Sequence, residues 1–320
     1  MINRELIRIK LVQVLYSYIQ KGIYKPDVAE KELLLSMDKA YDLYNYLLML
    51  LVEVGRMSVR MHEMRVARSK KLKDGVTWSR KFVDNRFIIQ LESNRQLRSY
   101  CAEQRLSWAD QEDFVRDLYN KVEQSDFYHK YMFSNTSSYE EDREIWRLIY
   151  RHLICNNDNL ANLLEDINVY WNDDKFIVDT FVLKTINRFT ENSTAAEPLI
   201  PEYKSDTDRD FATKLLYRAI VGQEYFNELI ASTTRKWELS RIAMMDKIIL
   251  QLGLAEITTF PNIPLSVSIN EYVEIAKMYS TPKSGKYINA TLDTIAKRLM
   301  EEGKLVKESP TPTPTKEEEE

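Results

Sequence analysis

Residues 262–289 read NIPLSVSINEYVEIAKMYSTPKSGKYIN, and this stretch decides the fold. Pro264 ends whatever precedes it, because its ring removes a backbone N–H and clashes with a continuing helix. Beyond it, apolar residues recur at three- and four-residue spacing, which predicts an amphipathic helix; they are Ile269, Tyr272, Val273, Ala276 and Tyr279. Thr281 and Pro282 predict the N-cap and first residue of a second helix. The apolar face of that helix carries Ile288, Leu292, Ile295 and Leu299.

The residue types in this stretch are more informative than their periodicity, which many amphipathic helices share. It resembles the C-terminal signature of the NusB family of transcription antitermination factors, which runs roughly IP-x-x-V-x-INEA, then AK, then SGK-(F/Y)-(V/I)-N, then LD. The residues that fall on this pattern in order and without a gap are Ile269–Glu271, Glu274, Ala276–Lys277, Ser284–Asn289 and Leu292–Asp293. The resemblance implies an all-α fold of NusB-like helical bundles.

Residues 207–257 extend the resemblance. The family has a helix that ends near I-x-x-x-x-x-x-W-x-(L/I)-x-R, followed by V-D-R-A-(I/L)-L-R-L-A-x-Y-E-(L/I). The matching residues are Ile230, Trp237, Leu239, Arg241, Asp246, Ile249–Leu250, Leu252 and Glu256–Ile257. Ala255 departs from the pattern, because the family commonly has Tyr there. The expected core face of this region contains Phe211, Leu215, Ala219 or Ile220, and Phe226.

The N-terminal residues 3–20 predict a first helix that begins at an Asn3 N-cap and stops at Gly22. Its expected core face contains Leu6, Ile9, Val12 or Gln13, Tyr16 and Ile19. Residues 12–16, VQVLY, match the family's A-x-Q-x-L-Y. Arg4, Arg8 and Lys10 stand where the family often has a denser basic run, so the resemblance makes them candidate RNA-binding residues.

Composition excludes several classes of protein. The chain has 320 residues but only 7 glycines, and nucleotide-binding α/β folds need glycines in their phosphate loops. Cys101 and Cys155 are too few for a disulfide framework or a zinc site, and the 3 histidines are scattered along the chain. We therefore expect an all-α protein without cofactor or metal.

Neither a leader nor a membrane span is expected. The first residues, MINRELIRIK, are charged from the start, unlike a signal peptide. The most apolar run, residues 46–52, is about a third of the ~20 residues that a bilayer needs. We expect a soluble, cytoplasmic protein with no membrane partner.

One region is strongly basic although the net charge of the chain is −4. From Arg56 to Arg86, ten Arg and Lys residues face only Glu63, Asp74 and Asp84. Trp78 and Phe82 are interleaved with them, and such a patch suits phosphate contacts with aromatic stacking. Its candidate RNA-binding residues are Arg65, Arg68, Lys70 and Lys71. The alternative is an ordinary solvated loop.

The pattern predicts four segments. Residues 1–69 are the N-terminal helices of a NusB-like fold, and 70–206 are a large helical insertion that ends in a linker from about 191. Residues 207–303 are the C-terminal NusB-like bundle. The tail, 304–320, contains PTPTPT and a run of Glu, so it should be disordered.

The resemblance also implies a function. The protein would bind the boxA-type RNA of ribosomal RNA leader transcripts together with NusE, a small-subunit ribosomal protein, and join the RNA polymerase elongation complex. The residues of the turn 281–286 allow two interpretations. In one, Lys283, Lys286 and the N–H groups of the first helical turn bind a phosphate while Tyr287 stacks on a base. In the other, Lys283 points into solvent and binds nothing.

Two alternatives belong to other classes. A NusB-like domain also forms the front half of a ribosomal RNA cytosine methyltransferase, but that enzyme needs a Gly-rich cofactor loop and a catalytic Cys after the domain, so no enzyme is expected. The acidic residues 140–142 and 173–174 have no base or nucleophile fixed beside them, which favours helix caps and turns. The other alternative is a NusB-fold interaction scaffold without strong RNA binding.

Overall fold

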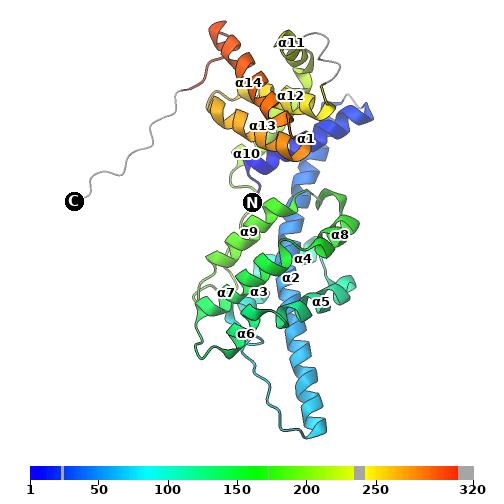
Figure 1. Ribbon diagram of the computed structural model, residues 1–320, viewed down its shortest axis with the longest axis vertical. Helices are drawn as coiled ribbons and strands as arrows, with labels where there is room; N and C mark the ends of the chain where they lie inside the picture. Colours follow the sequence, from blue (N-terminus) through cyan, green and yellow to red (C-terminus); the bar gives the residue numbers. More distant parts are fainter. Residues whose placement is uncertain (23–24, 172, 234–241, 309–320) are drawn as a thin grey trace, which may run out of the picture. The chain divides into compact units, whose positions relative to one another are not determined.

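The computed structural model shown in Figure 1 describes residues 1–22, 25–171, 173–233 and 242–308. These residues form helices joined by turns and short loops, and they contain no β-strand. The described residues contain one isolated β-bridge, which is parallel and joins Ile2 and Tyr203. The all-α prediction is confirmed, because apolar residues spaced by three and four favour helices that bury one face.

The chain divides into two compact units. The central unit contains residues 1–2 and 36–204, and the terminal unit contains residues 3–35 and 205–320. Helix α2 (Pro26–Leu72) is continuous through residue 35 and contributes to both. The sequence predicts a segment boundary at residue 70, whereas the two units meet at residue 36. They meet earlier because the apolar run of 40–54 is buried within the central unit.

The terminal unit is built around α12 (Met244–Thr259), where every residue from Ile248 to Ile257 is buried. A helix that is apolar nearly all round needs neighbours on all sides. Those neighbours are α1 (Arg4–Lys21), α10 (Asp206–Val221), α11 (Gln223–Thr233), α13 (Leu265–Tyr279) and α14 (Ser284–Glu301). The expected core residues Phe211, Leu215, Ala219 and Phe226 are all buried. The matched residues Trp237, Leu239 and Arg241 lie outside the described residues.

Helices α1 and α13 confirm their predicted ends. Asn3 caps α1 by accepting a hydrogen bond from the Leu6 N–H, and Gly22 ends it with φ 60°, a left-handed conformation that glycine adopts without strain. Helix α13 begins directly after Pro264. Tyr16 departs from the expected core face, because its side chain is exposed.

Helix α14 starts two residues later than predicted. Thr281 and Pro282 lie in the turn before it, and the helix begins at Ser284. The Ser284 hydroxyl accepts a hydrogen bond from the Thr281 N–H and donates one to Asp246 on α12, so the first residue of the helix is held to the preceding turn and to α12. Lys283 is the N-cap residue and makes no side-chain capping hydrogen bond. The predicted apolar face is confirmed, since Ile288, Leu292, Ile295 and Leu299 are buried.

The start of the predicted tail packs against the terminal unit. Leu305 is buried, Lys307 donates to the Phe260 carbonyl, and the Glu308 N–H donates to the Pro261 carbonyl. This differs from the expectation that residues from 304 onward bury nothing. The remainder, 309–320, lies outside the described residues.

The central unit packs short helices around α2. They are α3 (Arg86–Ser93), α4 (Arg95–Glu103), α5 (Glu112–Glu123), α6 (Asp126–Phe133), α7 (Tyr139–Ile149), α8 (Asp158–Ile167) and α9 (Lys175–Arg188). One π-helical turn (Tyr150–Ile154) extends α7, and two 3₁₀ turns (Ala109–Gln111 and Val169–Trp171) precede α5 and α9.

Two expectations for this unit need correction. The segment expected as a linker is packed, because Leu199 is buried and the Tyr41 hydroxyl donates to the Ile200 carbonyl. The second expectation was that the acidic residues 140–142 lie in caps and turns. Glu141 fits it, because it completes a capping box with Ser138. Asp142 instead is buried and accepts hydrogen bonds from other elements of the unit.

Candidate nucleic-acid interface

The first candidate RNA-binding residues lie on α1, and two of the three are buried. Arg8 is 3% exposed and Lys10 is 1% exposed. Arg4 has a half-exposed side chain that lies 3.8 Å from a carboxylate oxygen of Asp208 and over the ring of Phe211. The prediction for Arg8 and Lys10 therefore needs correction, since an RNA phosphate cannot reach a buried side chain. Of these three candidates, Arg4 is the one whose charge lies at the surface of the helix.

Arg8 belongs to a buried polar cluster. Its Nε and Nη2 donate to the two carboxylate oxygens of Glu256 at 2.8 and 2.9 Å, and its Nη1 donates to Glu271 at 3.0 Å. Glu256 also accepts from the Ser268 hydroxyl at 2.7 Å and the Tyr272 hydroxyl at 3.0 Å. Burial opposes the charge on Arg8, but the hydrogen bonds and charge of Glu256 outweigh it and raise the pKa of the guanidinium. This cluster joins α1, α12 and α13, so its role is structural.

The second candidate group lies at the start of α14. Lys283 is the N-cap residue, Lys286 is in the first turn, and both side chains are exposed. Tyr287 is half-buried and its hydroxyl oxygen is inaccessible to water, so only part of the ring is available for stacking. The serine of the SGK motif faces inward and the two lysines face outward. This turn therefore presents two positive charges at a helix N-terminus, where the partial charge is also positive.

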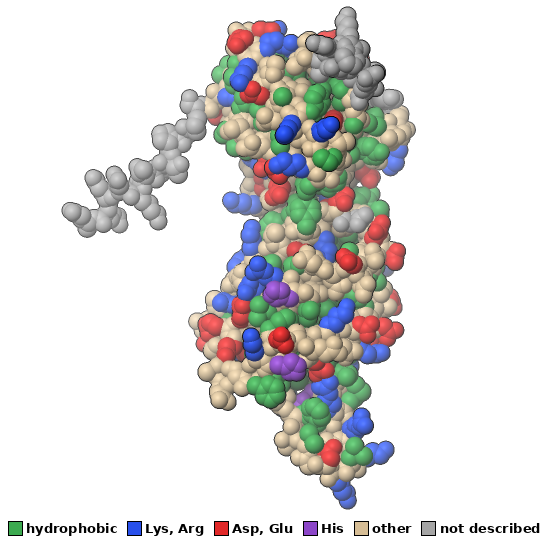
Figure 2. Space-filling view, in the orientation of Figure 1, with side chains coloured by type: hydrophobic (Ala, Val, Ile, Leu, Met, Phe, Trp, Pro, Cys, Tyr) green, Lys and Arg blue, Asp and Glu red, His purple; other side chains and the backbone are tan. Residues whose placement is uncertain are grey.

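The third candidate group lies at the end of α2 in the central unit. Arg68, Lys70 and Lys71 are exposed, and none of them forms an ion pair with another described residue. Figure 2 shows basic side chains around this end of the helix, with hydrophobic and histidine side chains nearby. Arg65 differs from the other three, because its Nη1 and Nη2 both donate to Glu123, the latter at 2.6 Å. It is committed to that carboxylate.

The two aromatic residues expected in the basic patch have different surroundings. Trp78 is 43% exposed, and the Arg65 guanidinium lies 5.3 Å from its ring centroid. Phe82 is buried and stacks on Trp146 with 5.2 Å between ring centroids. Phe82 therefore cannot stack on a base, which corrects the expectation for this residue. Arg65 acts by holding Trp78 in place.

Two cavities of the central unit meet at Trp78. The first, which we call the aromatic cleft, has a volume of about 350 Å³ and its lining includes His62, Arg65, Trp78, Tyr128, His129 and Phe133. The second, which we call the lysine groove, has a volume of about 560 Å³ and its lining includes Val66, Lys70, Lys73, Thr77 and Trp78. Both volumes fall in the range of ligand sites, roughly 300–1,000 Å³.

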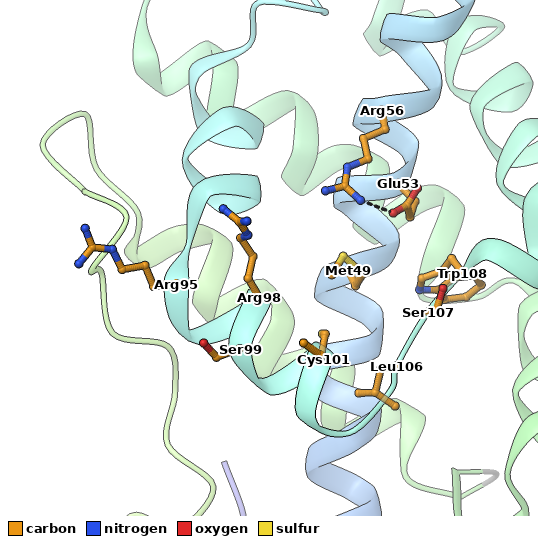
Figure 3. A pocket seen from close by; sticks show the side chains of 11 residues that line it. Met49, Glu53, Arg56, Arg95, Arg98, Ser99, Cys101, Leu106, Ser107 and Trp108 are labelled. Carbon is orange, nitrogen blue, oxygen red and sulfur yellow. Dashed lines mark hydrogen bonds and ion pairs between the residues drawn. The ribbon is translucent and has the colours of Figure 1, made fainter.

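A further basic cavity of about 660 Å³ lies beside α2 and α4. Figure 3 shows Arg56 and Arg98 extending from the two helices toward its mouth, while Arg95 extends away from it. Arg56 is neutralised by Glu53 and Glu92, each at 2.7 Å. Neither Arg95 nor Arg98 pairs with a described carboxylate. Arg95 and Arg98 are not among the candidate residues that the sequence indicated. Their i,i+3 spacing on one helix is the signal that could have identified them.

Both cysteines have raised pKa values. Burial raises the pKa of Cys101 to about 12 and that of Cys155 to about 11, the opposite of what a nucleophilic cysteine needs. No group of three His, Cys, Asp or Glu side chains among the described residues could hold a metal ion. In the same residues, no helix is long and apolar enough to cross a membrane.

Comparison with known proteins gives a consistent result. The model of the NusB family matches residues 178–297. The transcription antitermination protein NusB of Salinibacter ruber is 36% identical over 108 residues, which are 34% of this chain and 68% of that protein. That of Dictyoglomus turgidum is 39% identical over 30% of this chain and 66% of its own length. That of Methylacidiphilum infernorum is 44% identical over 28% of this chain and 63% of its own length.

The matched part thus spans about two thirds of these relatives, and for two of the three it is slightly less. A solved structure of T. maritima NusB aligns with 47% of this chain and 90% of its own, at 24% identity and a TM-score of 0.29. The family match begins within α9 and ends within α14, so it covers the terminal unit from α10 onward and the last helix of the central unit.

Proposed function

The chain belongs to the NusB family, and from that premise we propose that it is a transcription antitermination factor. It binds boxA-type RNA of ribosomal RNA leader transcripts together with ribosomal protein NusE, and the complex associates with the elongating RNA polymerase. No catalytic step is part of this function. The observation that carries the proposal is the family match of residues 178–297, which includes the gap-free signature of α13 and α14.

Among the candidate residues, those with exposed side chains are the ones that contact RNA, and both units carry some of them. On the terminal unit they are Arg4, Lys283 and Lys286, with the available part of the Tyr287 ring beside the lysines. On the central unit they are Arg68, Lys70 and Lys71. Arg8, Lys10 and Arg65 are left out of the interface, because two are buried and the third is held by a carboxylate.

The direct test is binding of a fluorescein-labelled boxA RNA by the full chain, measured by fluorescence anisotropy with and without NusE. A scrambled RNA of the same length is the control. The proposal expects tighter binding to boxA than to the scrambled sequence and a further gain when NusE is present. Equal affinity for the two RNAs under both conditions would refute it.

Lys283→Glu tests the turn before α14. A carboxylate at a helix N-terminus interacts favourably with the helix dipole, typically by ~0.3–1 kcal/mol, so the free protein should become slightly more stable. The same change should repel a phosphate and weaken boxA binding. Lys297→Glu is the control for RNA binding, because Lys297 is exposed on the same helix and makes the same change in charge; its stability should fall, since the change also breaks its ion pair with Asp293. A Lys283→Glu protein that is stabilised and binds RNA like the parent would rule out an anion site here.

A second candidate function is a NusB-fold interaction scaffold without strong RNA binding. The observation that favours it is the burial of Arg8 and Lys10, which leaves α1 with little basic surface. The same experiment separates the two candidates. A scaffold would bind NusE while showing no measurable preference for boxA RNA.

A further inference from the structure

The aromatic cleft and the lysine groove combine the two features that single-stranded nucleic acids require. We propose that together they bind a single RNA strand, with a base inserted in the aromatic cleft beside Trp78 and the phosphodiester backbone along the lysine groove. This inference deepens the proposed function and rests on it, since it assigns part of the RNA strand to the central unit.

The aromatic cleft presents rings that the fold does not cover. Phe133, the last residue of α6, is 83% exposed, and Trp78 is 43% exposed. Burying such large side chains normally stabilises a protein, so two exposed rings in one cavity indicate a surface that is covered by a ligand. Phe133 is stacked on His129 with 6.5 Å between ring centroids and 18° between planes. Bases stack on such rings with little regard to sequence.

Trp78 is held in position before any ligand arrives. The Arg65 guanidinium lies over its ring, and Glu123 fixes that guanidinium through two hydrogen bonds. The Tyr119 hydroxyl donates to the same carboxylate at 2.8 Å. Because this chain of contacts limits the motion of the indole ring, less conformational entropy is lost when a base stacks on it. Arg65 is therefore a positioning residue of this site.

The lysine groove supplies the complementary charge. Lys70 and Lys73 line it, Lys71 and Arg68 are exposed nearby, and none of the four pairs with a described carboxylate. The acid in this turn, Asp74, accepts hydrogen bonds from the Ser69 hydroxyl and the Val76 N–H. The groove thus carries a net positive charge, which attracts a phosphodiester backbone.

The combination favours a single strand over a duplex or a protein partner. A base can enter the aromatic cleft only if it is unpaired and unstacked. An acidic protein would satisfy the lysines but would not need adjoining exposed rings. A nucleic acid strand uses both, because phosphates and bases alternate along it.

The experiment measures anisotropy of a fluorescein-labelled 12-nucleotide oligouridylate and of a boxA RNA of equal length against the full chain. Trp78→Ala should weaken oligouridylate binding about tenfold, which is about 1.4 kcal/mol. Trp78→Phe should restore most of the affinity, because it keeps a ring. Leu72→Ala is the matched control, since Leu72 is an exposed apolar side chain at the end of α2, shortly before Trp78 in the chain, and is absent from the lining of both cavities.

The charge is tested separately. Lys70→Gln with Lys73→Gln should reduce the slope of log K against log salt by about 1.4, because each phosphate contact on a single strand contributes ~0.7. Lys121→Gln, an exposed lysine on α5, should leave the slope unchanged. Photo-crosslinking of a 5-bromouridine RNA gives the position, and the crosslinked peptide should contain Trp78 or Phe133.

The outcomes for this site and for the proposed function are distinguishable. If Trp78→Ala binds oligouridylate like the parent, the inference is overturned, whereas a boxA preference in the presence of NusE still supports the proposed function. If the parent shows no boxA preference but loses oligouridylate binding on Trp78→Ala, the site stands and the antitermination role fails. If no RNA crosslinks at Trp78 or Phe133 and an acidic protein binds there instead, the groove belongs to that partner and the inference is overturned.

Discussion

Replacing Arg8 with methionine should destabilise the terminal unit more than any other single charge removal on α1. Methionine keeps the unbranched shape of the arginine stem but removes its positive charge and donors. Glu256, which is fully buried, then loses two of its four hydrogen bonds and the cation that is hydrogen-bonded to it. Breaking a buried ion pair by removing one partner typically costs about 3–5 kcal/mol. That is a large part of the 5–15 kcal/mol by which domains are usually stable.

Arg4→Met is the matched control, because it removes the same charge from the same helix. Arg4 is half-exposed and lies 3.8 Å from Asp208, and exposed pairs of this kind contribute about 0–1 kcal/mol. The double variant Arg8→Met with Glu256→Gln should lose less stability than Arg8→Met alone, since no bare charge remains in the interior.

Urea denaturation followed by far-ultraviolet circular dichroism measures these free energies of unfolding. Under conditions where Arg8→Met remains folded, its affinity for boxA RNA should equal that of the parent, because Arg8 lies in the interior. A free energy loss no larger than that of Arg4→Met would refute the structural role. A selective loss of RNA affinity with full stability would restore Arg8 to the RNA interface.

Three further predictions concern other parts of the chain. Burial raises the pKa of Glu202 to about 7 from an ordinary value of 4.5, so the folded state holds this proton more tightly than the unfolded chain does. Its contribution to the stability of the central unit is complete below pH 4.5 and is lost as the pH rises through about 7, and Glu202→Gln should flatten this dependence in urea denaturation. Burial also raises the pKa of Cys101 to about 12, so iodoacetamide at about pH 8 should alkylate it far more slowly in the native protein than in urea. Gly253→Ala should lower stability by about 1–3 kcal/mol, because a Cβ there would lie 2.9 Å from the Leu292 side chain. Gly285→Ala should be neutral or stabilising, because its nearest contact would be an ordinary 3.4 Å; equal melting temperatures for the two glycine variants would contradict this account.

Helix positions could be predicted from the sequence because they depend on neighbouring residues. The spacing of Ile288, Leu292 and Ile295 marks the buried face of α14, and Asn3 and Gly22 mark the ends of α1. Helix α14 begins at Ser284 and not at Pro282, and the Ser284 hydroxyl bonds both Thr281 in the preceding turn and Asp246 on another helix. Sequence patterns describe local contacts well and such remote contacts poorly.

The candidate site was only partly predictable for the same reason. Trp78 and Phe82 lie four residues apart in one basic loop and were expected to stack on bases alike. Phe82 packs against Tyr128 and Trp146 from α6 and α7, whereas Trp78 remains exposed over Arg65. No feature of the loop itself distinguishes them. The aromatic cleft also needs Phe133, which is 55 residues beyond Trp78 in the chain.

By itself, the sequence determined the all-α class, both ends of α1, the start of α13 and the family, because periodicity, caps and motifs are local properties. Only the tertiary structure decided which charges reach solvent. Arg8 and Arg4 occupy equivalent positions in a basic N-terminal pattern, yet Arg8 meets Glu256, 248 residues away, and Arg4 lies at the surface. Whether a charge is buried depends on every neighbour that folding brings within a few ångströms, and most of those neighbours are remote in sequence.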